Sequence, residues 1–348
     1  MESTINQRVS AMAALGDDLR SLSSGEGQFY HSFMEAVASA EVRNRWFTPQ
    51  HSLNAAMALG EMLNKQDLDI WISRYKEKDA GISSKNVGLV LPGNVPMVGF
   101  HDLMCVLMAG HVAQVKYASD DAVLLPFLIN RLEEHNAGIG EQVSAANALL
   151  KGYEAVIATG SNNSARYFKQ YFGKVPHIIR KNRNAVAVLN GDESREGLSK
   201  LAADCMAYFG MGCRSVSKLY VPEGYLFDPL LHALSEFDSM TQHDKYRNNY
   251  DYNKALLLLN KQVHFDNGVV MLTENPSIAS PVSVIHFEYY RNVSDLEELV
   301  LNQAEQLQCI VSEADIFEGS VPFGRAQHPA LWDYADGVDT MAFLHSLS

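Results

Sequence analysis

The chain has 348 residues, and its 41 aspartates and glutamates against 28 lysines and arginines give a formal net charge of −13. This acidic balance argues against nucleic-acid binding, which requires a basic face. A composition of 47% hydrophobic and 20% charged residues is globular rather than disordered, and the length predicts two domains.

The first 20 residues lack the basic and apolar regions of a secretory signal, and no apolar run approaches the roughly 20 residues of a membrane helix. Four scattered cysteines form neither a disulfide framework nor a C-x-x-C pair. We therefore expect a reduced, cytoplasmic protein without a membrane span or a bound metal.

Residues 1–80 have apolar positions at helical spacing and predict a helical region that packs on the next domain. From residue 86 the pattern alternates between short apolar runs and amphipathic stretches. The expected strands are NVGLVL, VAQVKYA, YEAVIATG, HIIRKN and NAVAVLNG, and the expected helices are FHDLMCVLMAG, DDAVLLPFLINRLEEHN and SNNSARYFKQYFG. In the second of these helices, Asp120 and Asp121 stand at the start and complement the helix dipole. This order predicts a parallel, doubly covered sheet in a domain that spans 81–191.

The remainder predicts a second α/β domain over 192–320. It opens with the helix SREGLSKLAADCMAYFG, and its expected strands are SKLYVP, KALLLLN, GVVMLTE, PVSVIHFEYY and QCIVS, with a helix through DLEELVLNQAEQL. The charged stretch 235–254 is expected to be a mobile loop, and 321–348 a C-terminal segment that returns to the core.

One of the four cysteines has an unusual setting. Cys105, Cys205 and Cys309 lie in apolar runs and are expected to be small core residues. Cys213 instead follows Phe-Gly-Met-Gly, and the adjoining Arg214 would favour its thiolate. Local sequence leaves two interpretations open, a nucleophile or a core cysteine beside a glycine.

A second candidate site is ATGSNNS, where Thr159 and Gly160 end a strand and Ser161 begins a helix. Free backbone N–H groups at such a terminus suit a phosphate. An ordinary capped helix explains the same residues, and the dinucleotide fingerprint G-x-G-x-x-G is absent.

The order of the motifs resembles the aldehyde dehydrogenase superfamily, and in particular its LuxC-like acyl-CoA reductase (fatty-acid reductase) branch. The resemblance covers roughly 44–345 and rests on NRWFTP, LPGNVP, ATGS, VLNG, the phrase LAADCMAYFGMGCRSVSKLYVP and the ending VPFGRAQHPALWDYADGVDTM. It implies an aldehyde-dehydrogenase-like α/β fold, with a Rossmann-type NADP(H)-binding domain at 81–191 and a catalytic domain at 192–320.

The resemblance also implies roles for single residues. Cys213 matches the nucleophile, and Asn94 matches the asparagine whose amide helps to form the oxyanion hole; a plain turn residue between two prolines is the alternative for Asn94. Lys116 matches the lysine that contacts the adenosine ribose. Ser119 stands where members that prefer NAD carry a glutamate, so NADPH is the expected cofactor. The remaining matches near the cofactor are Thr159, Gly160, Ser161 and Gly191.

Two departures from the superfamily bear on the reaction. Val188 takes the place of the glutamate that activates water in oxidising members, and Asp192 and Glu193 come later. Ser277 takes the place of the glutamate in E-x-F-G-P, with Glu274 nearby. Without a base to activate water, hydrolysis of the acyl-enzyme would be slow, and the acyl group would be transferred to an acceptor other than water.

The expected function is NADPH-dependent reduction of an acyl-CoA, a fatty acyl thioester in this branch, to the aldehyde. Two alternatives stay open: a CoA-acylating aldehyde dehydrogenase that works oxidatively, and a non-redox acyl-carrier or interaction subunit. An acyl-protein synthetase or another acyl-transfer protein is a possible partner. Between YKEKDAG and NVGLVL there is little room for the hairpin through which superfamily members dimerise, so the oligomeric state stays open.

Overall fold

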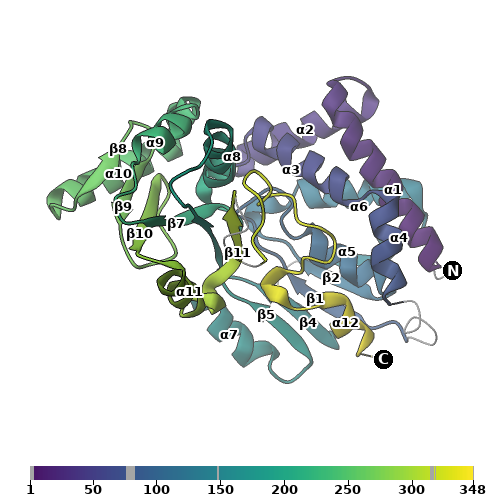
Figure 1. Ribbon diagram of the computed structural model, residues 1–348. Helices are drawn as coiled ribbons and strands as arrows, with labels where there is room; N and C mark the ends of the chain where they lie inside the picture. The colour runs from purple at the N-terminus through teal and green to yellow at the C-terminus, as the bar shows by residue number, and fades with distance from the viewer. Residues whose placement is uncertain (1–3, 76–82, 147–148, 314–316, 318, 348) are drawn as a thin grey trace. The chain divides into compact units, whose positions relative to one another are not determined.

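The computed structural model describes residues 4–75, 83–146, 149–313, 317 and 319–347 (Figure 1). The chain divides into two compact units, Met1–Asn182 with His328–Ser348, and Arg183–Gln327. The predicted boundary at residue 80 and the interval expected to lack a hairpin fall on 76–82, outside the described residues. None of the described helices is both long and apolar enough to cross a membrane.

The first unit begins with four helices, α1 (Ile5–Ser21), α2 (Gln28–Arg43), α3 (Pro49–Met62) and α4 (Lys65–Ser73). Thr4 starts α1 with a capping box, in which its side chain accepts from Gln7 N and the Gln7 side chain accepts in return. Met12, Leu15 and Leu19 form a fully buried stripe on α1, because positions three and four apart share one helix face. Through such contacts α1 packs on α3, α4 and α6.

The first sheet is parallel throughout and has the strand order β3-β2-β1-β4-β5. Its strands are β1 (Asn86–Val90), β2 (Val112–Lys116), β3 (Val143–Ala145), β4 (Ala155–Thr159) and β5 (His177–Arg180). Helices α5 (Phe100–Met108), α6 (Leu124–His135) and α7 (Asn162–Phe172) connect them. The near-continuous apolar runs of β1 and β4 are typical of strands that are buried on both faces. The predicted parallel sheet is confirmed for β1, β2, β4 and β5, whereas β3 was not predicted.

The end of the chain packs on the first unit. Helix α12 (Thr340–His345) contacts α5, and Trp71 Nε1 donates to Tyr334 Oη at 2.6 Å. Arg180 forms a buried ion pair with Asp102 at 2.7 Å and also donates to Thr340 Oγ1. The segment expected to return to the core as 321–348 is therefore divided, because 321–327 belongs to the second unit.

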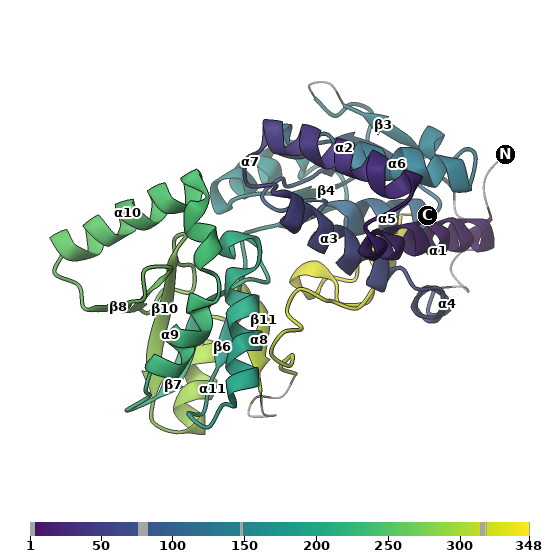
Figure 2. The same ribbon diagram turned by 90° about the horizontal axis from the view of Figure 1, so that it is seen from above.

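The second unit contains a six-stranded sheet of order β11-β6-β7-β10-β9-β8, in which only the β8–β9 pair is antiparallel among the described strands. Its strands are β6 (Asn184–Val188), β7 (Val216–Pro222), β8 (His264–Asp266), β9 (Met271–Glu274), β10 (Val284–Tyr290) and β11 (Leu307–Ser312). The helices are α8 (Arg195–Met206), α9 (Asp228–Ser235), α10 (Asp244–Leu259) and α11 (Val293–Leu301). Helices α8 and α9 lie side by side (Figures 1 and 2).

Two expectations for this unit differ from the structure. Strand β6 was expected to complete the first domain, but it pairs with β7 and β11 of the second sheet, because an apolar run does not specify which sheet it joins. The segment KALLLLN was expected to form a strand, and residues 235–254 were expected to form a mobile loop. Instead, α10 spans most of the first segment and more than half of the second. The buried residues of α10 recur every three or four positions and form a helical stripe, namely Tyr246, Tyr250, Asn253 and Leu257. The continuous run of leucines in the sequence concealed this interval.

Candidate active site

The carboxyl ends of three neighbouring strands meet at one edge of the first sheet. Val90 pairs with Lys116 of β2 and with Ala158 of β4, so the loops that follow these strands begin side by side. The strand order reverses between β1 and β4, and ligands of open α/β sheets bind at such a switch point. This edge brings together six predicted residues: Asn94, Lys116, Ser119, Thr159, Gly160 and Ser161.

At this edge, β4 leads directly into α7. The Ser161 side chain accepts from Ser164 N at 3.1 Å and caps the helix. A Cβ on Gly160 would lie 2.8 Å from the Phe168 ring, so the turn needs glycine at this position. The helix dipole and the N–H groups of the first turn suit an anion above the turn, so these residues fit the phosphates of a dinucleotide.

The segment after β2 carries an acid that the sequence argument did not weigh. Ser119 and Asp120 are both exposed, and Ser119 Oγ donates to Asp120 Oδ1 at 3.1 Å. Ser119 alone would permit NADPH, because it is uncharged. A carboxylate nevertheless stands beside Ser119, and it would repel a 2′-phosphate held there.

The loop after β1 is held by a buried carboxylate. Asn94 is exposed in this loop, and Met97 has a left-handed φ of 57°. Met97 N donates to Asp121 Oδ2 at 2.8 Å. Asp121 is only 2% exposed, and burial raises its pKa to about 7.

Asp121 was expected to stand at a helix start, but α6 begins at Leu124 and Asp121 belongs to a short 3-10 turn (Ser119–Asp121). Its contact with the loop after β1 was therefore missed. The structure distinguishes the two adjacent acids, because Asp120 is exposed and Asp121 is buried.

The second unit contains the cysteine singled out above. All four cysteines of the chain are described, and Cys213 is the exposed one, whereas Cys105 and Cys205 are buried and Cys309 is half-buried. Burial raises the pKa of the Cys105 and Cys205 thiols well above the ordinary value, which disfavours the thiolate in both. Exposure makes Cys213 the accessible nucleophile of the four.

The turn before Cys213 has a strained backbone. Tyr208, Phe209 and Gly210 have consecutive left-handed φ angles of 52°, 58° and 75°. Such a conformation costs of order 1–3 kcal/mol for each non-glycine residue and persists only where the surroundings impose it. Both aromatic side chains are buried, and the Phe209 ring lies 4.7 Å from the ring of His243, centroid to centroid.

A serine on the other side of Cys213 ties this turn together. Ser215 Oγ donates to Ala207 O at 3.0 Å and accepts from Gly212 N at 3.2 Å. The Gln327 side-chain amide donates to the same oxygen at 3.4 Å, and Arg214 donates to Ala326 O at 3.2 Å. Sequence reasoning did not single out Ser215, because a serine between a turn and a strand is common.

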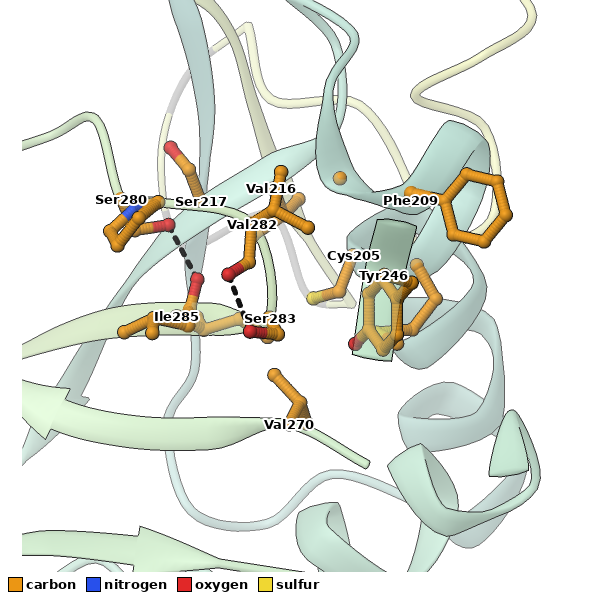
Figure 3. A pocket seen from close by; sticks show the side chains of 14 residues that line it. Cys205, Phe209, Val216, Ser217, Tyr246, Val270, Ser280, Val282, Ser283 and Ile285 are labelled. Atoms are coloured by element: carbon orange, nitrogen blue, oxygen red, sulfur yellow. Dashed lines mark hydrogen bonds between the residues drawn. The ribbon is translucent and has the colours of Figure 1, made fainter. Parts of the chain in front are cut away.

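A cavity lies beneath this turn (Figure 3). Its volume is about 20 Å³, and its lining includes Cys205, Phe209, Val216, Tyr246 and Ile285. A cavity of this size holds about one water molecule. It is too small for a fatty acyl chain.

Gly191 and Val188 lie far from Cys213 within the second unit. Val188 ends β6 and pairs with Tyr220, whereas Cys213 precedes Val216 at the other end of β7. Four strand residues separate the two ends by roughly 13 Å. Gly191, with a φ of 94°, forms the turn after β6, where Glu193 accepts from the Gly191 N–H at 3.2 Å.

The structure therefore does not bring Gly191 and Cys213 together. An acid at position 188 would not reach Cys213 within this unit, and the argument from a base missing at Val188 no longer applies. Asp192 and Glu193 follow Gly191 directly and stand at the same distant end.

Ser277 is exposed in the connection from β9 to β10. Its carbonyl oxygen lies 2.8 Å from the buried ring of His286, and Glu274 ends β9.

Comparisons with known structures identify the fold as aldehyde-dehydrogenase-like. A putative aldehyde dehydrogenase from Burkholderia cenocepacia is 13% identical, with a TM-score of 0.63 over 89% of this chain and 74% of that one. An NAD-dependent aldehyde dehydrogenase from Sinorhizobium meliloti is 11% identical, with a TM-score of 0.63 over 89% and 70%. An aldehyde dehydrogenase from Bacillus cereus, solved as an NAD+ complex, is 11% identical, with a TM-score of 0.61 over 89% and 72%. No family model and no curated protein matches the chain.

Proposed function

We propose that the chain is an acyl-CoA reductase that carries its acyl group on Cys213 and uses NADPH as the reductant. The observation that supports this most strongly is the exposed Cys213 on a strained and well-held turn in an aldehyde-dehydrogenase-like fold. The switch-point edge of the first sheet supplies the elements for a dinucleotide, namely the turn before α7 and the exposed Lys116 and Ser119.

The proposed chemistry uses few protein groups. The Cys213 thiolate attacks the thioester carbonyl, the new C–S bond forms, and CoA leaves and takes a proton. NADPH, when bound, supplies the hydride that reduces the acyl-cysteine. The thiohemiacetal on Cys213 then loses its hydroxyl proton and releases the aldehyde with breakage of the C–S bond. One acyl-CoA, one NADPH and one proton thus give one aldehyde, one CoA and one NADP+.

Negative charge develops on the carbonyl oxygen in both steps. Donors aimed at such an oxygen stabilise the transition state by about 3–4 kcal/mol each. We assign this role to the side-chain amide of Asn94 and the backbone N–H of Cys213. The acids after β6 lie at the far end of the second sheet, so neither serves in that unit as a base for hydrolysis at Cys213.

The test is mass spectrometry of the intact protein after mixing with acyl-CoAs of increasing chain length, without NADPH. An acyl adduct on Cys213 is expected, and NADPH should discharge it as aldehyde, whereas added CoA should return the thioester. Rapid release of free carboxylic acid without an adduct would contradict the proposal and indicate a hydrolytic dehydrogenase.

A second candidate function is a non-redox acyl carrier with the same fold. The observation that favours it is Ser277, which is exposed and uncharged where the resemblance would place the acid that contacts the nicotinamide ribose. Titration of the protein fluorescence with NADPH distinguishes the two functions, because a carrier forms the adduct but does not bind the cofactor.

A further inference from the structure

Asn94 lies between two contacts that tie its loop to a single neighbouring segment, residues 118–121. On one side, a Cβ on Gly93 would lie 2.6 Å from Ala118 Cβ, so the loop packs directly on Ala118. On the other side, Met97 N donates to Asp121 Oδ2 at 2.8 Å. Only Val95 and Pro96 separate Asn94 from this second contact.

Asp121 is well suited to fix the loop. Its side chain is buried, and its own N–H donates to Ala118 O within the 3-10 turn. The carboxylate holds Met97 in a left-handed conformation that methionine rarely adopts without an imposed partner. Pro92 and Pro96 in this loop have no N–H to donate. Besides the bond from Met97 N, the Gly93 carbonyl accepts from Asn44 Nδ2 at 3.5 Å.

Asp121 Oδ1 has no hydrogen-bond partner among the described residues, although the atom is buried. A buried acceptor without a partner destabilises the fold. A contribution to stability alone therefore does not explain why a carboxylate stands at this position. Burial without a counter-charge is also consistent with its raised pKa.

We propose that Asp121 is a positioning residue that fixes the loop 93–97 and so aims Asn94 at the carbonyl oxygen of the acyl thioester. The proposal rests on the proposed function. It also connects two parts of the site, because the same short turn contains Ser119, the residue proposed to select the cofactor. Displacement of a reacting group by about 1 Å can cost about 100-fold in rate, which sets the size of the expected effect.

The experiment compares Asp121→Ala with Asp121→Asn. The alanine removes the acceptor for Met97 N, whereas the asparagine keeps an oxygen at this position. The measurements are the rate of adduct formation on Cys213 with acyl-CoA alone and the Kd for NADPH. We expect Asp121→Ala to slow acylation by about 10- to 100-fold with a less than 3-fold change in the Kd for NADPH, and Asp121→Asn to recover most of the acylation rate.

Glu133→Ala is the matched control. The Glu133 carboxylate also accepts from backbone N–H groups, those of Gly138 and Gly140, but it holds a loop before β3, at the amino edge of the sheet. This variant should unfold at a lower temperature and acylate at the wild-type rate.

Gly93→Ala tests the other contact without altering Asp121, so it remains informative if Asp121→Ala does not fold. Its Cβ should push the loop from Ala118 and slow acylation, and Ala118→Gly in the same chain should restore the rate. Wild-type acylation by Asp121→Ala, or equal losses in the alanine and asparagine variants, would overturn this inference alone. Failure of the wild-type chain to form an adduct would overturn the proposed function, and this inference with it.

Discussion

The two units present their candidate residues on different kinds of backbone. In the first unit, Lys116 and Thr159 end regular parallel strands, and Asn94 follows a third. In the second unit, Cys213 stands on a turn with three consecutive left-handed residues. Strand ends position groups at little cost, whereas a strained turn needs side chains such as Phe209 and Ser215 to hold it. Activity should therefore be sensitive to the side chains that hold the Cys213 turn and the Asn94 loop, and less sensitive to packing beneath the ends of β2 and β4.

The largest effect should come from the nucleophile itself. Cys213→Ala should abolish the acyl adduct and lower turnover by about 10⁴-fold or more, as is typical when a covalent nucleophile is removed. Cys309→Ala, which alters a half-buried thiol in β11, should retain most of the activity. Turnover near the wild-type rate in the Cys213 variant would contradict the covalent mechanism.

Asp121 offers a test of the first unit that needs no substrate. Burial raises its pKa from 3.8 to about 7. The contribution of Asp121 to the stability of the fold is therefore fully present below pH 4 and is lost as pH rises through 7. Asp121→Asn removes this loss. Between pH 4 and pH 8, the unfolding free energy of the variant should therefore rise relative to that of the wild type by up to about 4 kcal/mol, since each pKa unit is worth about 1.36 kcal/mol. Urea unfolding across this pH range measures the difference, and a constant difference would show that Asp121 ionises normally.

Asn94→Ala tests the candidate residues of the first unit through their effect on catalysis. Loss of one oxyanion donor should lower kcat by about 100-fold, with little change in the binding of NADPH. Asn190→Ala, at an exposed turn after β6, is the control and should behave as wild type. An equal loss of NADPH affinity in the Asn94 variant would indicate a structural role.

Ser215→Ala tests the strained turn against a matched buried serine. Ser217 Oγ, in β7, donates to Ile278 O at 2.8 Å, in the connection between β9 and β10 rather than in the turn before Cys213. Both alanine variants should lose about 1–3 kcal/mol of unfolding free energy. Only Ser215→Ala should slow the formation of the acyl adduct on Cys213 from acyl-CoA, by about 10-fold, which is less than the roughly 100-fold cost of a full 1 Å displacement. Equal acylation rates in the two variants would show that Ser215 does not hold the turn.

The sequence predicted β1, β2, β4 and β5 of the first sheet because each contains a short apolar run, as in β4, which ends at Thr159. It did not predict β3 (Val143–Ala145), whose three residues form no apolar run. The same reasoning failed for β6, since pairing with β7 rather than β5 depends on contacts far apart in the chain. It also failed for α10, where three exposed leucines hide the buried stripe.

The candidate residues divide in the same way. Cys213 stood out by its glycines, and the structure gives it the expected exposure. Asp121 and Ser215 were missed because their importance comes from partners in space, Met97 N and Ala207 O, that no local pattern encodes. Gly191 was placed near the cofactor by motif order, and the register of β6 and β7 puts it at the far end from Cys213.

The smallest effect concerns the choice of cofactor, where Ser119 and Asp120 give opposite indications. The uncharged Ser119 permits a 2′-phosphate, whereas the Asp120 carboxylate beside it disfavours one. Both side chains are exposed, and water screens two charges at contact distance to an effect of about 5-fold. Asp120→Asn should therefore raise the ratio of kcat/KM for NADPH to that for NADH by about 5-fold, and Ser119→Glu should lower it by a similar factor. Opposite shifts in the two variants would place the adenosine ribose beside this turn. Unchanged ratios in both would mean that the ribose binds elsewhere along the sheet edge and that neither residue selects the cofactor.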